Sequence, residues 1–320
     1  MKLIVNIPCY NEEENLAAVI KEIPRHIPGI DKVEVLIMDD GSKDRTIQVA
    51  REAGADYIIS HKTNLGLATT FRDALEEAIR RGADIVVNTD GDNHYDQSKI
   101  PELIKPILEK RADIVIGSRK NLNTKNKNLN KIGSAIMTKW AGIPKYDVST
   151  GYRAYSKEAA MKIGVYSLHT YVHTTLLSAQ DLKLSMMEIP IADRPVDRPS
   201  RLIKNIPDHI WKAGWNIVTN IVIFRSLRFF GILGFLMFLP GIIVIGRFLY
   251  FYAIGDGDGH IQSLLLAAVL MIVGFLNIVL GLLGSSIGWS RKVSEDILYR
   301  VKKLEIAQEE QNNEKKDVQP

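Results

Sequence analysis

The chain has 320 residues, of which 46% are hydrophobic and 24% are charged, and its formal net charge is +4. This composition excludes a disordered protein, the length allows one large domain and a smaller part, and the net charge is too small to favour nucleic acid as a partner. The only cysteine, Cys9, excludes an intrachain disulfide framework and fits a reducing compartment.

The first 200 residues alternate short apolar segments with amphipathic ones. In chain order we predict a strand at Lys2–Ile7, a helix at Glu13–Ile23, a strand at Val33–Met38, a helix at Asp44–Ala53, a strand at Tyr57–Ser60, a helix at Leu67–Arg80, a strand at Ile85–Asn88, a helix at Ile100–Glu109 and a strand at Ile114–Gly117. Near-continuous apolar strands between such helices indicate an α/β domain over residues 1–200, with a parallel sheet covered by helices on both faces. The first apolar run is too short for a secretory signal, so we expect this domain to stay in the compartment where it is made.

The last 120 residues contain two long apolar segments. Residues 229–252 and 263–289 comprise about 24 and 27 residues, each enough to cross a hydrocarbon core of roughly 30 Å. The stretch between them has no Lys or Arg, whereas both outer flanks are basic. The positive-inside rule therefore predicts a transmembrane hairpin over residues 229–289, with residues 1–200 and both termini in the cytoplasm. A buried helical pair in a soluble protein is the alternative.

The segments on either side of this hairpin are amphipathic. Residues 201–228 mix Trp and aliphatic residues with Lys and His, which predicts helices lying in the membrane interface. Residues 290–320 predict a cytoplasmic helix and a polar tail, disordered from Gln308. Asn277 falls in the middle of the second span, where pairing with the neighbouring helix is expected.

The turn Asp90-Gly91-Asp92 directly follows an apolar strand. Side chains at i and i+2 of an extended segment point the same way, and glycine lets another group approach the backbone. Carboxylate oxygens suit Mg²⁺ or Mn²⁺, and such a cation would neutralise a diphosphate. His94 continues the spacing, so it is either a third metal ligand or an ordinary polar loop residue. We therefore predict a divalent metal site at Asp90, Asp92 and His94.

Two further loops should meet this turn. The loops Pro8–Glu14, Asp39–Asp44 and Asp90–Asp96 all leave the carboxyl ends of strands, where ligands of parallel sheets bind. Asn11, Glu12 and Asp40 offer polar groups for a base or a ribose, whereas Ser42 could simply cap the following helix. Both glycine-rich phosphate-binding signatures are absent, so a metal must meet any phosphate charge.

Residues 117–146 carry seven basic residues and no acidic one. This segment is either a solvated loop or a clamp for an anionic acceptor at the membrane.

The motifs together resemble the family 2 inverting glycosyltransferases of the GT-A fold, and within them the dolichyl-phosphate mannose synthase and polyprenyl-phosphate glycosyltransferase group. The resemblance covers about residues 1–205 in order. It rests on Pro8-x-Tyr10-Asn11-Glu12, Asp39-Asp40-Gly41-Ser42-x-Asp44, Asn64-x-Gly66, Asp90-x-Asp92, Gly117-Ser118-Arg119, Ser149-x-Gly151-Tyr152-Arg153 and Pro199-Ser200-Arg201-Leu202.

The resemblance implies metal-dependent, inverting transfer of a sugar from a UDP- or GDP-sugar to a membrane polyprenyl-phosphate. Nucleotide binding would fall on Pro8, Tyr10, Asn11, Glu12, Asp40, Asp90 and Gly91, and contact with the acceptor phosphate on Arg119, Lys131 and Arg201. Asp90 and Asp92 would hold Mg²⁺ or Mn²⁺, and these two residues and Arg119 would be the catalytic residues. The mannose synthases have Gln where this chain has His94, which leaves the third metal ligand open.

In the leading interpretation the acceptor is a phosphate monoester, which is already ionised near neutral pH, so transfer to it needs no catalytic base. Three alternatives to this interpretation remain. A glycosyltransferase that extends a glycan at a sugar hydroxyl would need a catalytic base, and Asp147 is a candidate. A nucleotidyltransferase and a non-catalytic membrane scaffold are the more distant alternatives.

Overall fold

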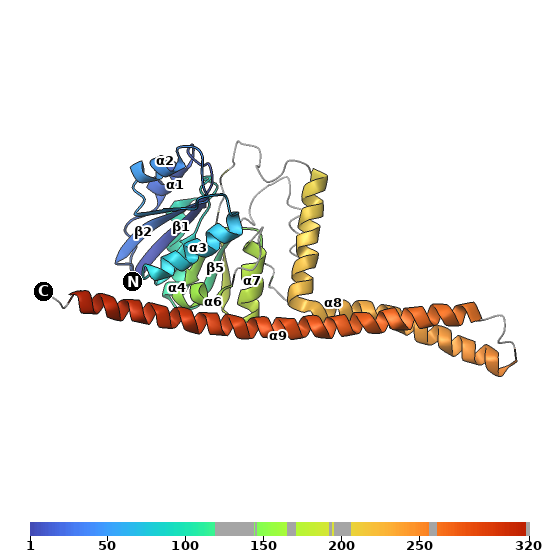
Figure 1. Ribbon diagram of the computed structural model, residues 1–320. Coiled ribbons are helices and arrows are strands. Elements are labelled where there is room, and N and C mark those ends of the chain that lie inside the picture. The colour runs from blue at the N-terminus through green and yellow to red at the C-terminus, as the bar shows by residue number, and fades with distance from the viewer. Residues whose placement is uncertain are drawn as a thin grey trace. The chain divides into compact units, whose positions relative to one another are not determined.

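The computed structural model describes residues 1–118, 144, 146–164, 171–191, 194, 206–255 and 261–317. The chain divides into two compact units, and Figure 1 shows its labelled helices and strands coloured from the N-terminus to the C-terminus. The first unit comprises Met1–Ile203 together with Glu295–Pro320, and the second comprises Lys204–Ser294.

The elements alternate along the first 118 residues much as the sequence predicts. In chain order they are β1 (Lys2–Cys9), α1 (Leu16–Glu22), β2 (Lys32–Asp39), α2 (Thr46–Glu52), β3 (Tyr57–Ser60), α3 (Leu67–Arg80), β4 (Ile85–Asn88), the 3₁₀ turn η1 (Gln97–Lys99), α4 (Ile100–Leu108) and β5 (Ile114–Ser118). Further along are β6 (Arg153–Ser156), α6 (Lys157–Lys162), α7 (Val172–Asp181), β7 (Met186–Pro190), α8 (Ile206–Ala253) and α9 (Ile261–Asp317).

The described strands form one seven-stranded sheet in the order β3-β2-β1-β4-β6-β5-β7. The neighbours β3, β2, β1 and β4 are parallel, and β5 is parallel to β7. β6 is antiparallel to both β4 and β5, so the expected all-parallel sheet is wrong at this strand. The chain inserts β6 between two strands that sequence order alone would place side by side. The α/β fold itself is confirmed.

Helices bury both faces of the sheet. One apolar cluster joins alternate residues of β1, such as Val5 and Ile7, to Leu16 of α1 and Leu103 of α4. On the other face α3 packs against β1 and β2 and buries Phe71 and Leu75 completely or nearly so. Because both faces are covered, β1, β2, β4 and β5 are mostly apolar on both faces instead of alternating apolar with polar residues.

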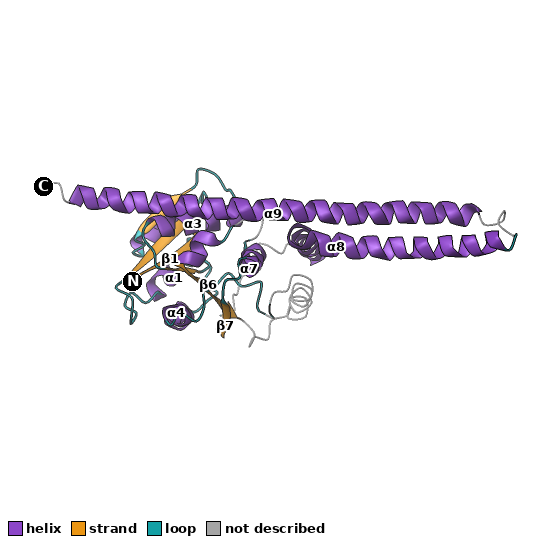
Figure 2. Ribbon diagram, turned by 90° about the horizontal axis from the view of Figure 1, so that it is seen from below, coloured by secondary structure: helices purple, strands orange, loops and turns teal. Residues whose placement is uncertain are grey.

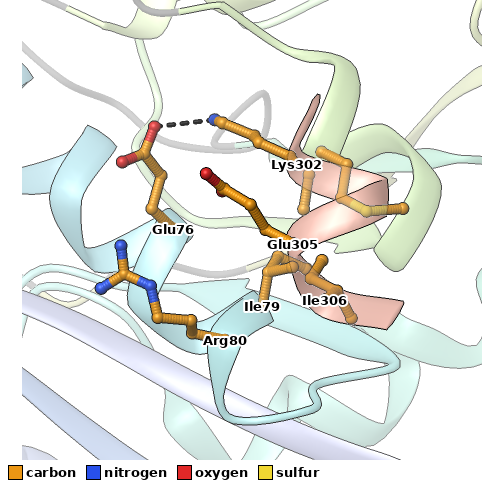
Figure 3. Close-up of a pocket in the computed structure, with 8 residues that line it drawn as sticks. Glu76, Ile79, Arg80, Lys302, Glu305 and Ile306 are labelled. Carbon is orange, nitrogen blue, oxygen red and sulfur yellow. Dashed lines mark hydrogen bonds and ion pairs between the residues drawn. The ribbon is translucent and has the colours of Figure 1, made fainter. Parts of the chain in front are cut away.

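The last part of α9 belongs to the first unit. Lys302 forms an ion pair with Glu76 of α3, with 2.7 Å between Nζ and Oε1, and Lys162 of α6 lies over the ring of Tyr299. A small pocket lies between α3, α6 and this part of α9 (Figure 3). None of the residues that line it belongs to the three loops of the expected site.

The second unit contains two long apolar helices, α8 and α9. By length and composition, Ile221–Ala253 and Ile261–Gln308 are each able to cross a membrane. The backbone of α8 departs from helical geometry at Arg225. The expected disorder from Gln308 is wrong, since α9 continues to Asp317, and the Glu, Gln and Lys residues there are good helix formers.

Small residues let α8 and α9 run side by side within this unit (Figure 2). A Cβ added to Gly234 would lie 2.6 Å from the carbonyl oxygen of Gly274, and one added to Gly274 would lie 2.8 Å from the amide nitrogen of Phe238. Such close approach of backbones is typical of packed membrane helices. Asn277 donates to the carbonyl of Val273 at 2.8 Å, and its Nδ2 lies 4.0 Å from Sδ of Met237 on α8.

Candidate functional site

The three loops predicted to converge do meet at the carboxyl edge of the sheet. The amide of Asp40 donates to the carbonyl of Cys9 at 2.9 Å, which joins the ends of β1 and β2. A Cβ on Gly91 would lie 3.4 Å from Cβ of Cys9 and 3.5 Å from Cγ of Glu12, so the third loop lies against the first. Parallel strands bring these segments together because they all end at the same edge.

Hydrogen bonds fix the first loop to the second. The amide of Asn11 donates to Oγ of Ser42 at 2.8 Å, and the amide of Lys43 donates to Oδ1 of Asn11 at 2.9 Å. Asn11 adopts a left-handed backbone conformation with φ of 54°, which asparagine tolerates better than most residues. Ser42 therefore links the loops, and its alternative role as a helix cap is not found. Asp44 instead accepts the amide of Thr46 at 3.0 Å, at the start of α2.

Asp40 is almost fully buried, with 4% of its surface exposed. Its Oδ1 accepts the amide of Leu65 at 2.8 Å, and its Oδ2 accepts the amide of Gly66 at 2.9 Å. Nδ1 of His61 also lies 2.9 Å from Oδ1. The Asp40 carboxylate therefore holds the turn that connects β3 to α3.

A buried polar network that crosses the sheet lies directly beside Asp90. Asn88, at the end of β4, donates through Nδ2 to the carbonyl of Gly151 and to the hydroxyl of Tyr171, both at 2.9 Å, and accepts Nδ2 of Asn6 at 3.0 Å. A Cβ on Gly151 would lie 3.0 Å from Oδ1 of Asp90. Burial and the negative charge of Asp90 raise the pKa of the Tyr171 hydroxyl well above its usual value, so that hydroxyl stays protonated beside the carboxylate.

The loop after Asp90 is fastened at several points. Oδ1 of Asp92 accepts the amide of His94 at 3.2 Å, and Asn93 adopts a left-handed conformation with φ of 60°. Arg194 holds the loop from outside, since its amide donates to the carbonyl of His94 at 2.8 Å and its guanidinium donates to Oδ1 of Asn93 at 2.8 Å. The same guanidinium donates to Glu22 of α1 at 2.9 Å. The sequence analysis missed Arg194, because no local motif marks it.

The donor set at this turn fits a divalent cation that also binds a ligand. Asp90 and Asp92 provide hard carboxylate oxygens, which Mg²⁺ and Mn²⁺ prefer. Within the described ranges, no three His, Cys, Asp or Glu side chains gather closely enough to hold a metal by themselves. Asp90, Asp92 and His94 are thus not assembled into a three-ligand site. A Mg²⁺ site commonly takes one or two carboxylates and completes its coordination with substrate phosphates and water.

The match to a known family decides what class of protein this is. The model for glycosyl transferase family 2 matches residues 4–164, which is half of the chain. The chain belongs to glycosyl transferase family 2. It is therefore a glycosyltransferase, and the resemblance noted from its motifs is confirmed.

Related family members carry informative names. The chain is 28% identical to polyprenol monophosphomannose synthase from Mycolicibacterium smegmatis, over 68% of this chain and 87% of that protein. It is 29% identical to UDP-N-acetylglucosamine–dolichyl-phosphate N-acetylglucosaminyltransferase from Methanococcus voltae, over 58% and 82%. It is 28% identical to undecaprenyl-phosphate mannosyltransferase from Micrococcus luteus, over 60% and 83%.

The fold has solved counterparts. Glucosyl-3-phosphoglycerate synthase from Mycobacterium tuberculosis, crystallised with Mn²⁺ and UDP, matches with a TM-score of 0.55 at 18% identity, over 69% of this chain and 78% of that one. The same enzyme has been crystallised with Mg²⁺ and UDP, and that structure matches with a TM-score of 0.53. These likenesses confirm the GT-A-like fold.

Not every predicted site residue of this glycosyltransferase falls in the described part of the chain. The acceptor-phosphate residues Arg119, Lys131 and Arg201 lie outside it. The converging loops carry Tyr10, Asn11, Glu12, Asp40, Asp90, Gly91 and Asp92, and Pro8 lies near the end of β1. Tyr10 is 38% exposed at this edge, whereas Pro8 is buried in β1.

Near the site, Arg153 is buried and His173 is partly buried, and sequence reasoning assigned a definite role to neither. Arg153 is fully buried and donates to the carbonyl of Val172 at 2.8 Å and to Oγ1 of Thr175 at 2.7 Å, which fixes the start of α7. Burial, with a further contribution from the positive charge of Arg153, lowers the pKa of His173 to about 4. The charge of Asp147 acts in the opposite direction. Arg153 is the last residue of the motif Ser149-x-Gly151-Tyr152-Arg153 and begins β6. Its place in that motif was the sequence signal that could have marked it as a residue near the site.

Proposed function

We propose that this glycosyltransferase transfers a sugar from a nucleotide-sugar to a membrane polyprenyl-phosphate, with a divalent metal and with inversion at the anomeric carbon. The match to this chain covers 82–87% of each of the three named relatives. Their names state that they act on polyprenol, dolichyl-phosphate or undecaprenyl-phosphate. Two helices able to cross a membrane fit a lipid acceptor. The donor is a UDP- or GDP-sugar, as the resemblance implies.

The observation that carries the proposal is the Asp90-Gly91-Asp92 turn in its setting. The network through Asn88 and Tyr171 fixes the backbone beneath Asp90, and Arg194 fixes the loop beyond Asp92. Two carboxylates are therefore held at the edge where nucleotide ligands of such sheets bind. Asp90 and Asp92 would hold the metal, which, when bound, neutralises the negative charge on the departing diphosphate.

The remaining chemistry asks little of the protein beyond positioning. An acceptor phosphate is ionised near neutral pH, so no side chain has to remove a proton from it. The work of the chain is then to hold donor and acceptor in line and to exclude water. Tyr10, Asn11, Glu12 and Asp40 line the edge for the nucleotide, and Arg119, Lys131 and Arg201 are proposed to contact the acceptor phosphate.

We further propose that both termini and the glycosyltransferase unit lie in the cytoplasm. The basic residues that flank the apolar helices, with none between them, support this orientation.

A panel of nucleotide-sugars tests the activity. The full-length protein in detergent is incubated with UDP- and GDP-sugars, Mn²⁺ or Mg²⁺ and undecaprenyl- or dolichyl-phosphate, and release of the nucleoside diphosphate is measured. We expect release that depends on the lipid phosphate and on the metal, and a lipid product labile to mild acid. Transfer only to a sugar-bearing lipid would overturn the proposal.

The variant Asp92→Asn tests the site. We expect kcat to fall about 100-fold or more, because the amide is a weaker ligand and carries no charge to hold the metal. Asp31→Asn changes an exposed carboxylate in the same unit and should retain activity. Full activity of Asp92→Asn, or full function of that variant in cells, would favour the scaffold alternative.

A further inference from the structure

His61 lies between two carboxylates behind the nucleotide edge of the sheet. Its Nδ1 is 2.9 Å from Oδ1 of Asp40, and its Nε2 is 3.2 Å from Oδ2 of Asp73 on α3. The His61 side chain is 12% exposed. An imidazole donates through one nitrogen in each neutral tautomer and through both when protonated, and here each nitrogen faces an acceptor.

The Asp40 carboxylate also binds the turn between β3 and α3, so the orientation of this carboxylate affects the turn. It accepts the amides of Leu65 and Gly66, where α3 begins. The second loop also rests on this turn, since a Cβ on Gly41 would lie 2.9 Å from the carbonyl carbon of Thr63. The Asp40 carboxylate therefore holds the turn in position through two hydrogen bonds. The turn also packs against Gly41, the residue next to Asp40.

The Asp40 carboxylate retains capacity for a ligand. A carboxylate offers about four acceptor positions, and three protein donors are placed on Asp40: two backbone amides and the His61 ring. One position can accept an N–H of a base or an O–H of a ribose. Leu65, whose amide is bound to Asp40, keeps its side chain 49% exposed and offers an apolar surface beside that position.

We propose that His61, backed by Asp73, is a positioning residue for the donor nucleotide: it orients Asp40 and thereby the turn 61–66 against which the nucleoside binds. This inference rests on the proposed function. It assigns His61 an effect on donor binding and none on the transfer step, because His61 contacts Asp40 and Asp73 and not the Asp90-Gly91-Asp92 turn.

Two isosteric variants separate the two nitrogens of the ring. The amide nitrogen of Asn occupies roughly the place of Nδ1, and that of Gln roughly the place of Nε2. We expect His61→Ala and His61→Gln to raise KM for the nucleotide-sugar about tenfold with kcat nearly unchanged. His61→Asn should restore KM to within about twofold of the wild type, and Asp73→Asn should raise KM less than His61→Ala does. His26→Ala removes an exposed histidine of the same unit and serves as the control.

Binding of UDP and GDP with Mn²⁺, measured by calorimetry on the full-length protein, gives a second readout that needs no acceptor. The affinity should fall in the same order as KM rises, and the melting temperatures should show that each variant is folded. If the wild type binds a nucleotide and His61→Ala and His61→Gln bind it equally well, this inference is wrong and the proposed function stands. Equal losses in His61→Asn and His61→Ala would also overturn it, since the retained donor would then not matter. If the wild type binds neither nucleotide, the proposed function fails and the inference fails with it.

Discussion

At the residue scale, the Asp90 carboxylate lies against Gly151, where any larger side chain would be crowded. A Cβ on Gly151 would lie 2.7 Å from the hydroxyl oxygen of Tyr171 and 3.0 and 3.1 Å from the two carboxylate oxygens of Asp90. The Tyr171 hydroxyl is held by Asn88, which also binds the carbonyl of Gly151 itself. A side chain at position 151 therefore crowds both the Tyr171 hydroxyl and the Asp90 carboxylate.

We expect Gly151→Ala to lower kcat about tenfold, because the added Cβ crowds the Asp90 carboxylate and small displacements of a site residue lower the rate. Overpacking should cost about 1–3 kcal/mol of unfolding free energy, so the protein stays folded. Initial rates with the donor found by the panel and a melting curve measure the two effects. Gly214→Ala, where an added Cβ meets nothing within 4 Å, is the matched control. Full activity of Gly151→Ala would show that the Asp90 carboxylate need not stay in place.

The lowered pKa of His173 should make the unfolding free energy decrease as the pH falls. Its pKa is about 4 in the folded protein and about 6.5 when unfolded. Between these values the unfolded chain binds a proton that the folded chain does not. The unfolding free energy should therefore decrease as pH falls through this window, by at most about 1.4 kcal/mol per pH unit. Above pH ~6.5 the histidine is neutral in both states and adds no pH dependence.

The measurement compares melting temperatures at pH 7.5 and 5.0 for the wild type, His173→Gln and His26→Gln. The wild type and His26→Gln should lose more stability on acidification than His173→Gln, which cannot bind the proton. Equal losses in all three proteins would contradict the burial of a neutral His173.

At this scale the sequence predicts the residues that would bind the metal better than the residues that hold them in place. Asp90 and Asp92 are recognisable because their spacing after an apolar strand is local. The contacts that Gly151, Tyr171 and Arg194 make with the site are not, although Gly151 belongs to one of the motifs, because each contact spans 60 or more residues of chain, as the separation of 63 between Asn88 and Gly151 illustrates. Contacts of that range depend on how β6 and α7 pack, which no local pattern contains.

At the element scale, the same distinction explains which strands could be predicted. β1, β2, β3, β4 and β5 are apolar runs between clear helices, and their ranges agree with the structure within two residues. β6 has the sequence Arg-Ala-Tyr-Ser and runs antiparallel. Its buried arginine finds acceptors in a carbonyl and a hydroxyl of α7 and in the carbonyl of Val148. A charged four-residue strand satisfied by a distant helix cannot be read from its own residues.

The helical hairpin of the second unit depends on glycine in the same way. Gly274 faces the backbone of α8, and a Cβ there would lie 2.8 Å from the amide nitrogen of Phe238 and 2.9 Å from the carbonyl oxygen of Gly234. We expect Gly274→Leu to separate the helices and to lower the temperature at which half of the detergent-solubilised protein aggregates by about 5 °C. Gly288→Leu places the same side chain on the same helix where an added Cβ meets nothing within 4 Å. An equal effect of both changes would mean that hydrophobicity, and not close packing, sets the stability of the hairpin.

At the scale of the whole molecule, the distribution of charge predicts the orientation in the membrane. Arg225 and Arg228 precede the first apolar segment and Arg291 and Lys292 follow the second, whereas residues 253–262 include two aspartates and no Lys or Arg. Basic flanks remain on the cytoplasmic side during insertion. A nucleotide-sugar made in the cytoplasm is then available to the glycosyltransferase unit without crossing the membrane.

Cysteines introduced one at a time test this orientation. The only native cysteine, Cys9, is buried and should not compete for the labelling reagent. Cys9 is 5% exposed, and burial together with nearby carboxylates raises the pKa of its thiol, so it should react slowly with maleimides. Ile254→Cys and Leu304→Cys replace side chains that are 60% and 65% exposed. In intact cells an impermeant maleimide should label Ile254→Cys at once and Leu304→Cys only after the membrane is opened. The reverse pattern would place the glycosyltransferase unit outside, away from cytoplasmic nucleotide-sugars. Recovery of both variants in the soluble fraction would instead favour the buried helical pair.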